Sequence, residues 1–103
     1  PYTYAGTKQS LADFSKMLKI QQLAIAQSCE KVLYDSSHKL NAFSKQLVKD
    51  HCACVARTTS NHPAFIQKMY HIAQHSRSKT EYTSKMEAVG KDIADYCQKI
   101  VNP

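Results

Sequence analysis

The sequence predicts an all-α fold, on the basis of its turn residues, its hydrophobic period and its composition. Only two glycines and three prolines occur among the 103 residues, and neither residue type lies between Gly6 and Pro63. Apolar residues recur through that stretch about every 3.6 residues, whereas a strand would need alternation with a period of two. Because 43% of the residues are hydrophobic, the chain is also too apolar for a disordered protein.

A first long helix is expected from about residue 10 to residue 56. Ser10 offers a hydroxyl that accepts a hydrogen bond from a free amide in the first turn, and Asp13 places a carboxylate near the positive end of the helix dipole. At a rise of 1.5 Å per residue this helix would be about 65 Å long. Residues 1–9 contain a proline and a glycine without any hydrophobic period, so we expect a flexible lead-in there.

The weakest part of this helix is the polar segment Asp-Ser-Ser-His at residues 35–38. Short polar side chains compete there for backbone hydrogen bonds, so a break is the alternative to a continuous helix. We favour continuity because Val32, Leu40 and Phe43 keep the same helical phase across the segment.

A second helix is expected from about residue 63 to residue 101, after a polar loop at residues 57–62. Pro63 suits the first position of a helix, and it disfavours a helical backbone at the preceding His62. Residues 76–84 lack large aliphatic side chains, so we expect the second helix to loosen there.

Two long antiparallel helices joined by a short loop form an αα-hairpin. A solitary hairpin would leave each apolar stripe covered on one side only, and a monomer does not tolerate exposed patches of that size. We therefore expect the hairpins to associate into a helical bundle or coiled-coil homo-oligomer. The stripe, which is also the candidate binding surface, consists of Leu11, Phe14, Leu18, Ile25, Val32, Leu40, Phe43, Leu47, Phe65, Met69, Ile72, Met86 and Ile93.

The four cysteines are expected to be free thiols. Cys52 and Cys54 differ by about 200° around a helix, so they face different sides of it. In the expected hairpin Cys29 lies opposite Gly90 rather than Cys97, and the offset of about 10 Å along the axis exceeds disulfide reach. This arrangement predicts a cytoplasmic protein in a reducing environment.

Composition and motifs disfavour several function classes. The 14 basic and 8 acidic residues give a net charge of +6, but the lysines are spread along the chain as on solvated helix faces. A nucleic-acid surface is therefore not the favoured interpretation. The sequence has neither a glycine-rich phosphate loop nor a Glu-x-x-His metal motif, so we predict a protein that is not an enzyme and holds no cofactor. The longest uncharged run of the first helix, residues 20–29, is too short to span a bilayer.

A zinc site is the one metal centre that the spacing allows. His71 and His75 share a helix face, and His51 and Cys52 would lie about one turn away on the facing helix. Exposed helical histidines without a metal are commoner, and the spacing Cys-x-Cys at Cys52 and Cys54 lacks the two-residue spacer of zinc and redox motifs. We therefore predict no metal site.

One protein family has a similar order of features. The sequence QSLADF at residues 9–14 opens the first helix, and NHPAFIQ at residues 61–67 leads into a second helix that carries Tyr70, Ala73 and Tyr82. This order of long helix, short polar connection and second helix resembles the phasins, small proteins that coat intracellular polyhydroxyalkanoate granules in bacteria.

The resemblance implies a non-enzymatic coat protein that binds the surface of polyester granules with its apolar stripe, while the lysine-bearing face stays in water. Burial of apolar area contributes about 25 cal/mol per Å² both in an oligomer and on a polymer surface, so the protein could partition between the two. The alternatives are a helical adaptor or effector that binds a protein, and a basic helical bundle associated with nucleic acid.

Overall fold

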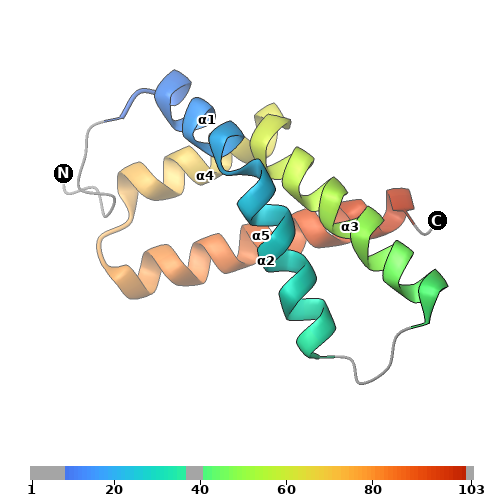
Figure 1. The fold of residues 1–103 in the computed structure, drawn as a ribbon. Helices are drawn as coiled ribbons and strands as arrows, with labels where there is room; N and C mark the ends of the chain where they lie inside the picture. Colours follow the sequence, from blue (N-terminus) through green and yellow to red (C-terminus); the bar gives the residue numbers. More distant parts are fainter. Residues whose placement is uncertain (1–8, 37–40, 102–103) are drawn as a thin grey trace.

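The computed structural model describes residues 9–36 and 41–101, and this part of the chain forms five helices (Figure 1). In chain order they are α1 (Leu11–Ile20), α2 (Gln22–Asp35), α3 (Ala42–Asn61), α4 (Pro63–His75) and α5 (Lys79–Val101). The all-α prediction is confirmed for these residues. Apart from Gln9, the expected lead-in lies outside them. Within the same residues, every helix is too short or too polar to cross a membrane.

The single helix expected over residues 10–56 is divided into α1, α2 and α3. Ser10 caps α1 as predicted, because its Oγ accepts from the Asp13 amide at 3.0 Å. At Gln21 the backbone turns to φ −87° and ψ 2°, and its amide donates to the carbonyl oxygens of both Met17 and Leu18. This tightened turn separates α1 from α2.

The expectation of a continuous helix through residues 35–38 is wrong. Helix α2 ends at Asp35, and the Ser36 hydroxyl donates to the Leu33 carbonyl at 3.1 Å, a local bond of the kind that competes with helix continuation. A new helix begins after Asn41, whose Oδ1 accepts from the Ser44 amide at 2.8 Å. Residues 37–40, including Leu40 of the predicted stripe, lie outside the described residues.

The prediction of a loop at residues 57–62 is also wrong, because α3 continues to Asn61 and only His62 separates it from α4. His62 is extended, at φ −80° and ψ 112°, and Pro63 occupies the start of α4, both as predicted. The serine that suggested a loop is satisfied within the helix: buried Ser60 donates from its hydroxyl to the Ala56 carbonyl at 2.7 Å.

The second expected helix is divided where it was predicted to loosen. Ser76 leaves the helical conformation, with φ −68° and ψ 134°, and its buried hydroxyl donates to the Ile72 carbonyl at 2.6 Å. The Ser78 Oγ then accepts from the Glu81 amide at 3.1 Å as α5 begins. The loosening is confined to residues 76–78, and the rest of the predicted segment is helical.

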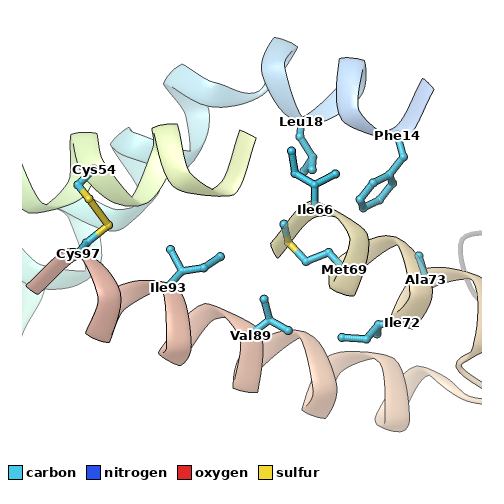
Figure 2. Close-up of a cluster of buried hydrophobic side chains, with 10 residues drawn as sticks. All are labelled: Phe14, Leu18, Cys54, Ile66, Met69, Ile72, Ala73, Val89, Ile93 and Cys97. Carbon is cyan, nitrogen blue, oxygen red and sulfur yellow. A yellow bond between two sulfur atoms is a disulfide. The ribbon is translucent and has the colours of Figure 1, made fainter. Parts of the chain in front are cut away.

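Helix α3 is the centre of the packing, since α1, α2, α4 and α5 all contact it, and α4 also packs on α5 (Figure 1). The core contains side chains from α1, α3, α4 and α5 (Figure 2). Its buried members are Phe14, Leu18, Cys54, Ile66, Met69, Ile72, Ala73, Val89, Ile93 and Cys97. Folding back in this way shortens the molecule to 49 Å along its longest axis, well below the 65 Å expected for one helix.

Candidate binding groove

The four cysteines form two disulfides, so the prediction of free thiols is wrong. Cys29 is bonded to Cys52 and Cys54 to Cys97, with Cα–Cα separations of 5.5 and 5.8 Å. The prediction failed because it assumed one hairpin with its turn near residues 57–62. The break after α2 instead places α2 against α3, which brings Cys29 to Cys52.

The two neighbouring cysteines of α3 reach two different helices. Cys52 bonds to α2 and Cys54 bonds to α5, as expected for side chains that differ by about 200° around a helix. The Cys54–Cys97 bridge is part of the core, with its half-cystines 4% and 0% exposed (Figure 2). The hydroxyl of buried Thr58 lies 3.7 Å from the Cys54 sulfur and 3.5 Å from the Cys97 sulfur.

An apolar groove of about 250 Å³ lies beside these disulfides, and we call it the α2–α3–α5 groove. Its lining consists of Leu33 from α2, Leu47, Val48 and His51 from α3, and Gln98 and Val101 from α5. Both outer helices pack on α3, and the described residues of α2 and α5 make no close backbone contact with each other. Helix α3 therefore forms the floor of the groove, and the other two helices form its walls.

Each wall of the groove is covalently attached to the floor. Leu33 follows Cys29 by four residues and so lies one turn away on the same face of α2. Val101 has the same relation to Cys97 on α5. His51 of the floor directly precedes Cys52. Each disulfide thus restrains one wall of the groove close to its floor.

An exposed aromatic side chain borders the groove. Phe43 is 72% exposed and precedes Leu47 by four residues, which makes the two side chains neighbours on the surface of α3. Phe43 therefore extends the apolar surface of the groove along α3. Exposed apolar surface of this kind is typical of interaction sites.

The predicted stripe does not form one continuous surface. Its members Phe14, Leu18, Met69, Ile72 and Ile93 are buried in the core, whereas Ile25, Leu47, Phe65 and Met86 are half-buried. Leu11, Val32 and Phe43 are exposed. Only Leu47 lines the α2–α3–α5 groove. The other five lining residues were not predicted to form a binding surface, although His51 was considered as a zinc ligand. Leu33 and Val101 each lie four residues after a cysteine, but this spacing becomes informative only once Cys29 and Cys97 are known to be bonded.

The four residues considered for zinc are not brought together. Cys52 is bonded to Cys29, and His51 lines the groove. The exposed rings of His71 and His75 lie with their centres 4.3 Å apart on α4 and are tilted by 37° to each other. Among the described residues, no group of three or more histidines, cysteines or carboxylates is arranged to hold a metal ion.

Two ion pairs lie at the surface of the described residues. Lys85 donates to Glu81 at 3.0 Å, and this hydrogen bond holds the pKa of the Glu81 carboxyl below its ordinary value. Lys68 lies 3.6 Å from Asp92, with both side chains more than half exposed. Exposed pairs of this kind contribute little to stability, and neither borders the groove.

No family model, curated protein or solved structure shows a significant match to this chain.

Proposed function

We propose that the protein is a helical binding protein that takes an apolar side chain of a partner protein into the α2–α3–α5 groove. The observation that carries this proposal is an apolar groove whose two walls are each bonded to its floor, next to the exposed Phe43. A preformed groove avoids the entropy cost of ordering its walls on binding. A protein of this kind is the helical adaptor or effector that the sequence left as an alternative to a granule coat.

The volume of the groove favours a protein side chain over a free small molecule. Sites for drug-sized ligands measure roughly 300–1,000 Å³, whereas this groove measures about 250 Å³. A pocket of that size suits one anchor side chain of a larger interface. Phe43, one turn from the lining residue Leu47, extends the apolar surface beyond the groove, where a small ligand would not reach.

The two disulfides support an oxidising compartment, such as the extracellular space, as the place of action. Disulfides persist in such compartments and are reduced in the cytosol of most cells. This location differs from the expected cytoplasmic one, in which the granule-coat function would operate.

Peptides selected from a random phage-displayed library on the oxidised protein test the groove. We expect the selected peptides to share an apolar anchor residue. Phe43→Ala should lower the affinity for these peptides about 30-fold, which is equivalent to about 2 kcal/mol, a typical value for an interface anchor. Gln98→Trp, which fills the groove from an exposed position, should abolish binding. Affinities are measured by fluorescence polarisation.

Leu23→Ala is the matched control, because Leu23 is 69% exposed and lies outside the groove. It should leave the peptide affinity unchanged. Peptides that bind Phe43→Ala and Gln98→Trp as tightly as the wild type would contradict the proposal.

The granule-coat function is the second candidate, and one observation favours it. Ile20 and Leu23 are 75% and 69% exposed, and no charged residue occurs between Ile20 and Cys29. This uncharged outer face could adsorb to a polyester surface, or to a second copy in a homo-oligomer. The core residues of the predicted stripe would not take part, because they are enclosed by α1, α4 and α5.

Adsorption to polyester particles tests this candidate. Leu23→Glu should reduce the adsorbed fraction at least about tenfold, because an unpaired carboxylate pressed against an apolar surface costs several kcal/mol. Lys31→Glu on the same helix should have little effect. Both residues are exposed, so neither change disturbs the core. If Lys31→Glu abolishes adsorption and Leu23→Glu does not, the attachment is electrostatic and the granule-coat function is wrong.

A further inference from the structure

A second and larger groove runs between α1 and α4 on another part of the surface. It measures about 560 Å³, within the roughly 300–1,000 Å³ of small-molecule sites. We call it the α1–α4 groove. Its lining consists of Leu11, Ala12, Ser15 and Lys19 from α1, Asn61 from the end of α3, and Pro63, Ile66 and Gln67 from α4.

The lining changes from apolar to cationic along α1. Leu11, Ser15 and Lys19 are spaced by four residues and so form one row on the helix surface. The row spans about 12 Å at 1.5 Å per residue. Lys19 stands at one end with its Nζ 2.9 Å from the Ser15 Oγ, and Leu11 stands at the other end. Aliphatic side chains of Pro63 and Ile66 continue the apolar part on α4.

Lys19 is the one ionisable residue of this lining, and no carboxylate faces it from either helix of the groove. A single cation complements a single negative charge, which a carboxylate carries, whereas a phosphate monoester carries between about −1.5 and −2 at pH 7. The aliphatic part of the lining, which is formed by Leu11, Ala12, Pro63 and Ile66 and contains no aromatic ring, complements an alkyl chain. The neutral amides of Asn61 and Gln67 complete the lining and add no charge.

We propose that the α1–α4 groove binds a free medium-chain fatty acid, with its carboxylate beside Lys19 and its alkyl chain directed toward Leu11. The Ser15 hydroxyl and the Lys19 ammonium are the hydrogen-bond donors for the carboxylate. This site is separate from the α2–α3–α5 groove, since the two share no lining residue.

Calorimetric titration of the oxidised protein with decanoate, decanol and decyltrimethylammonium, each below its micelle concentration, tests the proposal. We expect decanoate to bind with one-to-one stoichiometry and decanol to bind at least tenfold more weakly. We expect no saturable binding of decyltrimethylammonium, whose positive charge would face Lys19. Equal affinities for all three compounds, or no saturable binding of decanoate, would overturn the proposal.

Two variants locate the binding. Lys19→Met should lower the affinity for decanoate to that for decanol. Lys16 is an exposed residue of the same helix that lies outside the groove, so Lys16→Met should change neither the affinity for decanoate nor that for decanol. Ala12→Trp fills the groove from an exposed position and should abolish binding of both compounds without changing the circular dichroism spectrum. Equal effects of Lys19→Met and Lys16→Met would show non-specific ion pairing and overturn the assignment. Phe43→Ala should not affect decanoate, which separates this test from that of the peptide groove.

Discussion

Replacement of both Cys54 and Cys97 by alanine is expected to lower the free energy of unfolding by about 4 kcal/mol. The bond joins residues separated by 43 positions, and removing a cross-link of that span restores about this much chain entropy to the unfolded state. For a domain of this size the loss corresponds to a decrease in Tm of roughly 15–30 °C. Thermal unfolding followed by circular dichroism measures it.

Titration of thiols in the unfolded wild-type protein, prepared without reductant, is the control for this experiment. It should find no free thiol, because all four cysteines are paired. Wild-type protein treated with reductant loses both bridges, so it should lose at least as much stability as the double variant, which keeps the bridge between Cys29 and Cys52. Four titratable thiols in the untreated protein, together with a Tm that the double substitution leaves unchanged, would refute the assignment of the core bridge.

The substitution Ile93→Ala is expected to destabilise the protein by roughly 2–5 kcal/mol. Ile93 is 2% exposed and is among the largest fully buried side chains, next to Val89 and Cys97 of the core (Figure 2). Its truncation leaves a cavity between α5 and the helices packed on it. Urea unfolding at equilibrium measures the change.

Ile100→Ala provides a matched control, because it makes the same chemical change on the same helix at a side chain that is 57% exposed. Its effect should stay within about 0.5 kcal/mol. Similar losses for the two variants would mean that Ile93 does not occupy the core position described.

Local chemistry predicted the helix ends better than the helix lengths. The cap at Ser10 and the start of α4 at Pro63 follow from hydrogen bonds and backbone restrictions within a few residues, and both are observed. The interruption at residues 76–78 falls within the segment that was predicted to loosen because it lacks large aliphatic side chains. The division between α2 and α3 was missed because apolar residues keep the same 3.6-residue phase on both sides of residues 36–41. A periodic pattern reports which face of a helix is apolar, but it does not report a reversal of the chain.

The candidate grooves depend on how the helices are placed in space, which the sequence pattern does not specify. Leu47 was selected as an apolar position, but its partners Leu33 and Val101 belong to helices far apart in the chain. The disulfide pairing was missed for the same reason, since the distance of Cys29 from Cys52 depends on the turn between them. Lys19 carried no signal of its own among many surface lysines.

The attachment of both disulfides to α3 also determines what a protease can release. A cut between Cys29 and Cys52 leaves its two products joined by the first bridge, and a cut between Cys54 and Cys97 leaves them joined by the second. Between Cys29 and Cys97, only the peptide bonds on either side of Ala53 are unprotected in this way, and they lie in the interior of α3. A molecule cut once at almost any bond of this range would therefore remain in one covalent piece, and its fragments would migrate separately only after reduction.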